Sequence, residues 1–226
     1  MRRILMVAVA AFALSMPQLA KASDEQQAVD DAVSAVQHLS VATGVASSAR
    51  DLLHRARGVM IIPTLVKGGF IIGGQGGTGL LLSRDQKTGS WSYPAFYAMG
   101  AGSFGLQIGL EVSKIMLIIM NDKALNAMMQ DEFKIGAEAG IAVVTLGAGA
   151  ETSTTAAGGA DIYALAESAG LFGGIAIQGG IVKPRVEQDH AYYHRNVTAQ
   201  DIVLRRAAKN PGAENLRAEL RKVAGG

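Results

Sequence analysis

The chain has 226 residues, with 21 Lys and Arg against 19 Asp and Glu, which gives a formal net charge of +2. Hydrophobic residues make up 49% of the chain and charged residues 18%, so the composition excludes an intrinsically disordered protein. The sequence contains no cysteine. This excludes disulfides, a thiolate nucleophile, cysteine-ligated zinc and lipidation of an N-terminal cysteine.

The first 22 residues have the pattern of a secretory signal peptide. Two arginines precede an apolar stretch at residues 4–14, and Ala20-Lys21-Ala22 forms a small-x-small cleavage site. A membrane anchor needs about 20 apolar residues, and this stretch is shorter. We therefore predict a cleaved signal peptide at residues 1–22 and a single domain at residues 23–226. The expected location is periplasmic, or peripheral on the membrane of the cell envelope.

Cleavage would change the charge balance. Residues 1–22 hold three of the 21 basic side chains and no acidic one, so the rest of the chain carries a net charge of −1. Attraction to an anionic membrane or to nucleic acid would then depend on a local patch. Aromatic residues make up only 5% and no basic stripe is interleaved with them, so we expect no nucleic-acid partner.

Two helices are expected at the start of the domain. Ser23-Asp24-Glu25-Gln26 resembles a capping box, and apolar residues recur at helical spacing over Val29–Leu39. A second cap pattern at Ser48–Asp51 precedes a short amphipathic segment, and Gly58 marks its exit into extended chain.

Short apolar or alternating pieces follow, bounded by Gly, Pro or a polar turn, and this pattern predicts antiparallel strands. The expected strands are Val59–Ile62, Gly69–Ile72, Gly79–Leu82, Trp91–Met99, Phe104–Val112 and Ile115–Met120.

The second half of the domain is also expected to contain both helices and strands. Asn121 or Asp122 caps a helix, and the Gly, Ala and Thr of segment 147–160 predict a loop or a wide hairpin. Further strands are expected at about 134–148, 159–166 and 171–182. Thr198 and Asn210 then cap two C-terminal helices. The fold class is α+β, with Gly-rich antiparallel sheets flanked by N-terminal and C-terminal helices, and periodicity leaves open whether the sheets form a sandwich or a barrel.

Several blocks of the chain occur in the order found in one known family. They are ARGVMIIPTLVKGGFIIGGQGGTGLLL at 56–82, WSYPAFYAMGAGSFGLQIG at 91–109, a hydrophobic piece with Asn121-Asp122, ADIYALAESAGLFGGIAIQGGIV at 160–182 and HAYYHRNVTAQDIV at 190–203. These blocks resemble the SYLF domain family. The resemblance implies a domain that associates with anionic phospholipids, phosphoinositides in eukaryotic relatives, where it often accompanies SH3 or FYVE modules. This chain has neither module.

In eukaryotic SYLF domains, membrane contact is attributed to basic residues and an amphipathic helix near the start of the domain. The matching region here contains Arg50, Arg55, Arg57 and Lys67, opposed only by Asp51. Each basic residue near an anionic bilayer contributes about 1 kcal/mol, so these four predict reversible binding, although charged helix faces are commonly just solvated. The next candidates are Lys183, Arg185, Arg195, Arg205, Arg206, Lys209, Arg217, Arg221 and Lys222.

Two motifs resemble enzyme signatures without the expected context. Gly74-Gln-Gly-Gly-Thr-Gly79 matches GxGxxG, but a strand rather than a helix is expected there, which favours a glycine hairpin over a nucleotide site. Ala101-Gly-Ser103-Phe-Gly105 approximates a nucleophile elbow, and Asp161 with His190 or His194 would complete a triad. The residues that follow alternate like a strand. A serine hydrolase using Ser103 is therefore an outlying alternative.

His190 and His194 are four residues apart, a spacing that would place two imidazoles on one face of a helix, with Asp189 as a third metal ligand. The next capping signal is only at Thr198, so we expect an extended or loop segment here, and no metal or cofactor. Gly74 and Gly105 are expected to be structural, where backbones approach closely. The sequence thus predicts non-enzymatic binding of anionic phospholipid head groups. A protein-interaction or envelope-assembly module without lipid specificity is the alternative.

Overall fold

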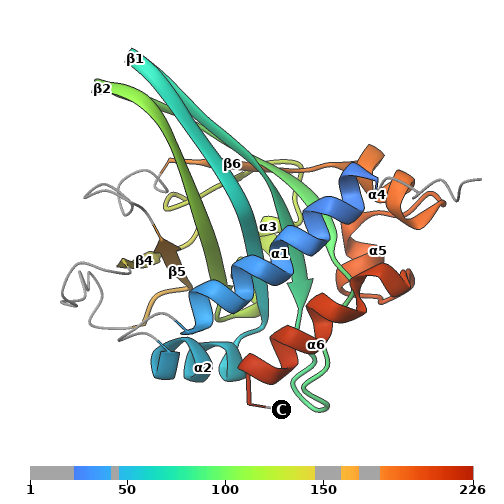
Figure 1. Cartoon of the computed structure of the whole chain (residues 1–226). Coiled ribbons are helices and arrows are strands. Elements are labelled where there is room, and N and C mark those ends of the chain that lie inside the picture. Colours follow the sequence, from blue (N-terminus) through green and yellow to red (C-terminus); the bar gives the residue numbers. More distant parts are fainter. Residues whose placement is uncertain (1–22, 42–45, 146–158, 168–178, 226) are drawn as a thin grey trace, which may run out of the picture.

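The computed structural model describes residues 23–41, 46–145, 159–167 and 179–225 (Figure 1). Its helices are α1 (Asp24–Val41), α2 (Ala46–Arg55), α3 (Asp122–Met128), α4 (Val186–Tyr193), α5 (Ala199–Val203), the 3-10 helix η1 (Pro211–Ala213) and α6 (Glu214–Val223). Its strands are β1 (Gly58–Ser83), β2 (Ala95–Ile119), β3 (Phe133–Lys134), β4 (Ile141–Thr145), β5 (Ile162–Glu167) and β6 (Ile181–Pro184).

β1 and β2 form a long antiparallel ribbon that folds back on itself. The two strands pair along almost their whole length. Yet Gly77 in the second half of β1 lies against Thr64 in the first half, whereas residues so far apart in an extended strand would be about 40 Å from each other. The two halves of β1 therefore lie side by side. The ribbon doubles back near a register irregularity between Gly69 and Ile71 (Figure 1).

Two features of the sequence permit this bend and close contact. Pro63 has no backbone N–H, and it lies where the register of β1 shifts between Ile62 and Leu65, as is usual for proline at a bulge. A Cβ atom on Gly77 would overlap the carbonyl oxygen of Thr64. Only glycine therefore lets the two halves of β1 approach this closely.

The six strands form one sheet that is mostly antiparallel. Its order is β3-β6-β2-β5-β4, with β1 also paired to β2. β6 pairs with the N-terminal part of β2 and β5 with its C-terminal part, while β4 joins β5 in parallel. Because β1 and β2 fold back, the sheet is an arc of eight strand segments, a curled half-barrel. The α+β class with flanking helices is confirmed, and of the two arrangements left open by the sequence, the described part of the sheet has the barrel-like one, as a half-barrel.

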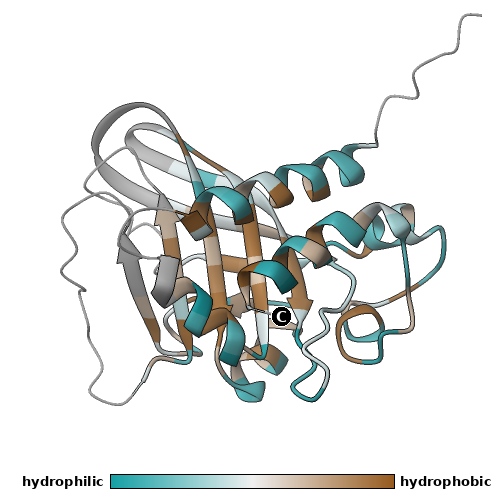
Figure 2. Cartoon of the chain, turned by 60° about the horizontal axis from the view of Figure 1, so that its bottom comes forward, coloured by the Kyte–Doolittle hydropathy of each residue, from teal (hydrophilic) through white to brown (hydrophobic). Residues whose placement is uncertain are grey.

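α1 and α6 cross the same side of the sheet, with α2 next to one end of each (Figure 1). Hydrophobic residues colour the strands beneath them, and polar residues colour the outer sides of these helices (Figure 2). The buried residues of α1 are Val29, Ala32, Ala35, Val36 and Leu39, and they join those of β1, β2 and α6 in one core. Among the described residues, no helix is both long and apolar enough to cross a membrane.

The helix-capping predictions with clear local signals are confirmed. Asn121 accepts a hydrogen bond from the Ala124 N–H and caps α3. Thr198 forms the predicted capping box of α5, and Asn210 caps η1, which runs into α6. α1 begins directly after Ser23, as expected.

Other predictions of local structure are wrong. α2 begins at Ala46, before the predicted cap at Ser48. His190 lies in α4 rather than in an extended segment. The six expected strands between 59 and 120 are two, β1 and β2, because the glycines that were expected to separate them lie within continuous strands. Trp91 forms only an isolated bridge with Arg84.

The GxGxxG motif lies within β1, opposite β2, and is not a hairpin. A Cβ on Gly74 would meet nothing nearer than 3.9 Å, so the close approach predicted there occurs at Gly77 instead. Residues 1–22, most of segment 147–160 and residues 171–178 lie outside the described residues. The predictions made for them stay predictions.

Candidate functional site

Three of the four predicted lipid contacts lie on or directly after α2. Arg50 is exposed on α2. Arg55 is exposed at the end of the helix and forms an ion pair of 2.5 Å with Asp51, one turn earlier. Arg57 follows the helix, and its Nε lies 3.5 Å from a carboxylate oxygen of Asp122. The local charge of this region is therefore partly compensated within the protein.

Lys67 is not part of this group. It lies on β1 opposite Glu111, toward the bend of the ribbon. At about 3.3 Å per residue, the strand carries it about 30 Å from Gly58, which adjoins the end of α2. The structure therefore does not bring Lys67 together with the three arginines.

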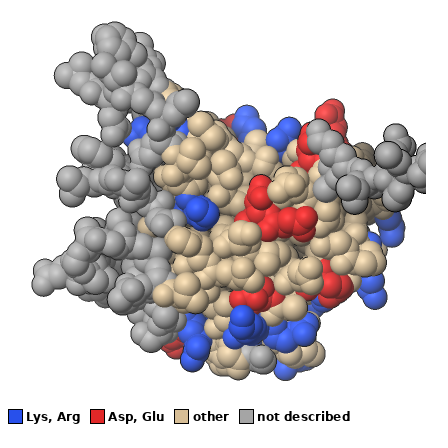
Figure 3. Space-filling model, in the orientation of Figure 1, with Lys and Arg blue, Asp and Glu red and all other residues tan. Residues whose placement is uncertain are grey.

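α6 brings a second set of basic residues to the same surface. α2 packs against α6, and the Cδ atom of Arg50 lies 3.9 Å from where a Cβ on Gly225 would stand. Arg221 and Lys222 are exposed in the last turn of α6, just before this contact. We call Arg50, Arg55, Arg221 and Lys222 the α2–α6 surface. Lys and Arg gather along the edge of the molecule where these helices lie (Figure 3).

The α2–α6 surface keeps a net positive charge. Arg55 pairs with Asp51 and Lys222 with Glu219, both within one helix, and such exposed pairs contribute little free energy. Arg50 and Arg221 form no ion pair with any residue that the structure describes. Basic residues in the last turn of a helix also interact favourably with the helix dipole, which accounts for part of this arrangement.

Several other basic residues of the C-terminal region are engaged in contacts within the protein. Arg217 is 16% exposed; its Nε donates to the carbonyl of Trp91 and its guanidinium lies over the ring of Tyr93. Arg206 donates to the side chain and carbonyl of Ser90. The further pairs are Lys183 with Glu132, Arg205 with Asp201, and Arg195 with the Ala207 carbonyl. These contacts make them weaker candidates for a ligand than the α2–α6 surface.

The apolar sides of the first two helices are already used in the core. Ala49, Leu52 and Leu53 of α2 are buried, as are the apolar residues of α1. Among the residues of α2 whose side chains the structure describes, 49–55, no broad apolar stripe is left to insert into a bilayer. Val41, at the end of α1, is 75% exposed. The described parts of α1 and α2 therefore offer charge and little exposed apolar area, and the other exposed large hydrophobic residues among those described lie outside these helices: Val66, Val112, Val186 and Leu204.

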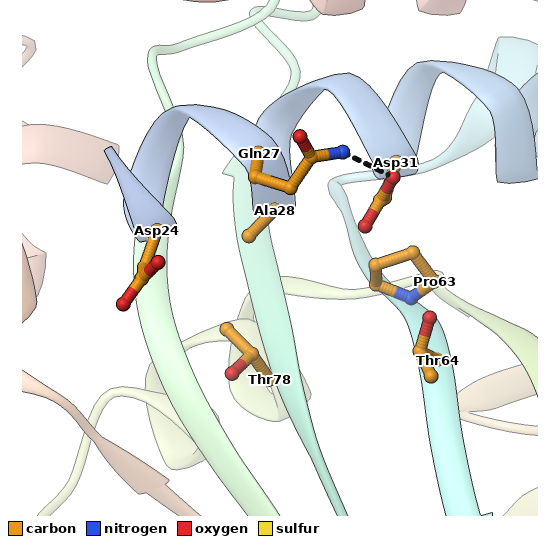
Figure 4. Close-up of a pocket in the computed structure, with 7 residues that line it drawn as sticks. All are labelled: Asp24, Gln27, Ala28, Asp31, Pro63, Thr64 and Thr78. Atoms are coloured by element: carbon orange, nitrogen blue, oxygen red, sulfur yellow. Dashed lines mark hydrogen bonds between the residues drawn. The ribbon is translucent and has the colours of Figure 1, made fainter. Parts of the chain in front are cut away.

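A small pocket lies between the N-terminal half of α1 and β1 (Figure 4). It has a volume of about 230 Å³. Its lining is Asp24, Gln27, Ala28, Asp31, Pro63, Thr64 and Thr78. Gln27 donates a hydrogen bond of 2.9 Å to Asp31. Two carboxylates make this pocket unsuited to a phosphate, so it is separate from the basic surface in chemistry as well as in place.

The residues of the hydrolase alternative are not assembled. Ser103 lies within β2, opposite Gly73, so the strand-turn-helix of a nucleophile elbow is absent at this position. Asp161 accepts from the Gly140 N–H at 2.8 Å and from Asn121 at 2.6 Å, and these hydrogen bonds lower its pKa. His190 is on α4, on the other side of the structure from the start of β5 (Figure 1). The geometry gives this alternative no support.

The histidine pair likewise forms no metal centre in the described structure. His194 ends α4 in the left-handed conformation, with φ of 51°. Asp189 is fully buried, and its Oδ1 accepts from the Phe96 N–H. Among the described residues, no three His, Asp or Glu side chains are arranged to hold a metal ion.

Comparison with known proteins defines the class of this domain. Residues 100–223 match the family Ysc84, described as "Las17-binding protein actin regulator". LAS seventeen-binding protein 3 of Saccharomyces cerevisiae is 31% identical over 169 residues, which cover 74% of this chain and 36% of that protein. Human SH3 domain-containing YSC84-like protein 1 is 28% identical over 166 residues, 73% of this chain and 48% of that protein.

The chain thus spans between about a third and a half of the length of these relatives. It belongs to the Ysc84 family, the SYLF domain family that its sequence blocks resemble.

Proposed function

We propose that this protein binds anionic phospholipid head groups at a membrane surface of the cell envelope, without catalysing a reaction, and that the α2–α6 surface makes the contact. The observation that carries the proposal is the packing of Arg50 against the end of α6. It joins two basic clusters, distant in the sequence, into one exposed surface. Phosphate groups are the ligands that such a surface attracts.

The strength of binding follows from the number of basic side chains. Each Lys or Arg near an anionic bilayer contributes about 1 kcal/mol, so Arg50 and Arg221 supply about 2 kcal/mol, and Arg55 and Lys222, which are paired with Asp51 and Glu219, add less. This supports reversible rather than permanent attachment. Because the apolar sides of α1 and α2 are buried, electrostatic attraction is the main term, and salt should weaken it as the Debye length falls from about 10 Å at 0.1 M to about 3 Å at 1 M.

The location in the envelope is part of the proposal. It is supported by the basic start, the short apolar stretch and the small-x-small site of residues 1–22. An exported protein would meet the anionic lipids of the envelope rather than cytoplasmic phosphoinositides. Phosphatidylglycerol is therefore a suitable anionic lipid for the first test.

Co-sedimentation of residues 23–226 with vesicles tests the proposal. We expect binding to vesicles of phosphatidylcholine with phosphatidylglycerol at 0.1 M salt, little binding to phosphatidylcholine alone, and loss of binding at 1 M salt. Equal binding to neutral and anionic vesicles, or binding that survives 1 M salt, would contradict the electrostatic contact.

A protein partner is the second candidate, and the family description, which names a protein-binding activity, favours it. In this alternative the chain is an interaction or envelope-assembly module without lipid specificity. Vesicles of pure lipid separate the two candidates, because they contain no protein. Absence of binding to anionic vesicles by folded protein at low salt would support the protein partner.

A further inference from the structure

Asp189 is the one charged side chain of the described residues that is fully buried. It lies on α4, a helix of eight residues between β6 and the C-terminal helices. A carboxylate placed where water cannot reach is costly unless cations or several hydrogen bonds compensate it. The surroundings of Asp189 therefore decide which protonation state the fold accepts.

One oxygen of Asp189 continues the pairing of the sheet edge. β6 pairs with β2 as far as Pro184 opposite Tyr97, and the chain then turns into α4. The Arg185 N–H donates to the Phe96 carbonyl at 2.8 Å, and Asp189 Oδ1 accepts from the Phe96 N–H at 2.9 Å. The Asp189 carboxyl oxygen thus accepts the hydrogen bond that a backbone carbonyl would accept if β6 continued along β2. It fixes α4 to β2.

Tyr193 makes a second attachment at the same edge. Its hydroxyl donates to the Pro94 carbonyl at 2.6 Å, two residues before Phe96. α4 is therefore held by hydrogen bonds from its middle to β2 and from its end to the residue that directly precedes β2. Of these two hydrogen bonds, only the one to Asp189 involves a carboxyl group.

The other oxygen of Asp189 has no hydrogen-bond partner among the described residues. The titratable groups that interact electrostatically with Asp189 are the phenols of Tyr97, from β2, and Tyr193, from α4 itself, and the charge of Asp189 contributes to raising their pKa values. The nearby cation, Arg217 of α6, influences Tyr193, but no ion pair joins it to Asp189. Burial without a cation raises the pKa of Asp189 to about 7.

We propose that Asp189 makes the docking of α4 on β2 depend on protonation of its carboxyl group. In the neutral acid, Oδ1 still accepts from the Phe96 N–H and no charge is buried. In the carboxylate, the same hydrogen bond remains, but an uncompensated charge is held between α4 and β2. Deprotonation therefore favours the state in which α4 leaves β2 and Asp189 reaches water.

The direction of the pH dependence follows from the two states. When α4 is detached, Asp189 has the ordinary aspartate pKa of 3.8. When α4 is docked, burial raises the pKa of Asp189 to about 7. The stabilising effect of protonation is complete below 3.8 and is lost as the pH rises through about 7. The docked helix is thus weakest in neutral and alkaline solution.

Hydrogen exchange of the Phe96 amide tests this directly, because that N–H is released when Asp189 leaves. After correction for the intrinsic exchange rate, the opening equilibrium should rise by up to about tenfold per pH unit from pH 5 toward 7 and level off above it. Asp189→Asn keeps the acceptor oxygen and cannot ionise, so its corrected exchange should not change with pH. Glu187→Gln, at an exposed position on the same helix, should behave as the wild type.

A carboxyl ¹³C titration of Asp189 in the wild type provides a second measurement that does not depend on any variant folding well. A midpoint near 7 supports the proposal. A midpoint below about 5, or an equal rise of corrected Phe96 exchange in wild type and Asp189→Asn, would overturn it. Neither result bears on lipid binding by the α2–α6 surface.

Discussion

Gly77 is where the doubled ribbon is most sensitive to substitution. A Cβ at this position would overlap the carbonyl oxygen of Thr64 and lie 3.2 Å from Ile62 Cγ2 and 3.3 Å from Leu65 Cα. Two of these three atoms belong to the backbone, so the conflict cannot be relieved by a side-chain rotation. Overpacking of a core costs about 1 to 3 kcal/mol, and a backbone conflict belongs at the upper end. For a domain of this size, about 3 kcal/mol lowers Tm by about 6 to 12 °C.

We therefore expect Gly77→Ala to lower the Tm by about that amount in a thermal unfolding experiment followed by circular dichroism. Gly74→Ala is the matched control, because Gly74 is exposed in the same strand and its nearest neighbour would be 3.9 Å away. The Tm of Gly74→Ala should lie within about 2 °C of the wild-type Tm. Equal Tm values for the two variants would refute the side-by-side packing of the two halves of β1.

Three further predictions concern the helix caps and the N-terminus. Thr198→Ala should destabilise the protein by about 1 kcal/mol in urea unfolding, because it removes the N-cap of α5; no change in midpoint would contradict this role. The hydrogen bonds from Thr198 and the guanidinium of Arg205 lower the pKa of Asp201 to about 2. This stability contribution is present above 3.8 and lost as the pH falls toward 2, so Asp201→Asn should lose stability relative to wild type at pH 6 and much less at pH 2. N-terminal sequencing of the exported protein should begin at Ser23, and a protein that retains Met1 would contradict the predicted cleavage.

Local signals in the sequence predict several elements and miss others for identifiable reasons. The caps at Asn121 and Thr198 can be predicted from the sequence because each side chain accepts a hydrogen bond from the backbone N–H three residues later. α4 has no side-chain hydrogen bond at its N-cap, and its attachment comes from contacts of Asp189 with β2 and of Tyr193 with Pro94. Contacts with residues so distant in the sequence produce no periodic pattern within the eight residues of α4.

The fold-back of the ribbon is also non-local. Glycines in the sequence mark places where strands can bend or approach, but which glycine meets which backbone depends on where β1 folds back on itself. This is why the tight position is Gly77 and not Gly74. The strands themselves were predicted in the correct region, in more pieces than the structure contains.

The same distinction applies to the basic surface. Arg50, Arg55 and Arg57 were grouped by their closeness in the sequence, and the structure keeps them near one another. Lys67 was grouped with them on the same basis, yet an extended strand carries it away. Arg221 joins Arg50 only because α6 packs against α2, which no local pattern predicts.

The role of the α2–α6 surface in lipid binding can be tested by comparing two variants that each lose two positive charges. Arg50→Ala with Arg221→Ala removes the two residues of the α2–α6 surface that form no ion pair with a described residue. Lys134→Ala with Lys183→Ala removes two exposed lysines near Glu132, on the paired strands β3 and β6. β6 lies away from α2 and α6 in Figure 1.

Both variants should be shown to be folded before their affinity for vesicles with phosphatidylglycerol is measured at 0.1 M salt. At about 1 kcal/mol per residue, the arginine variant should bind about 30-fold more weakly than the wild type, and the lysine variant should stay within about threefold. Equal losses in the two variants, or none in the arginine variant, would show that the α2–α6 surface is not where this protein meets anionic lipid.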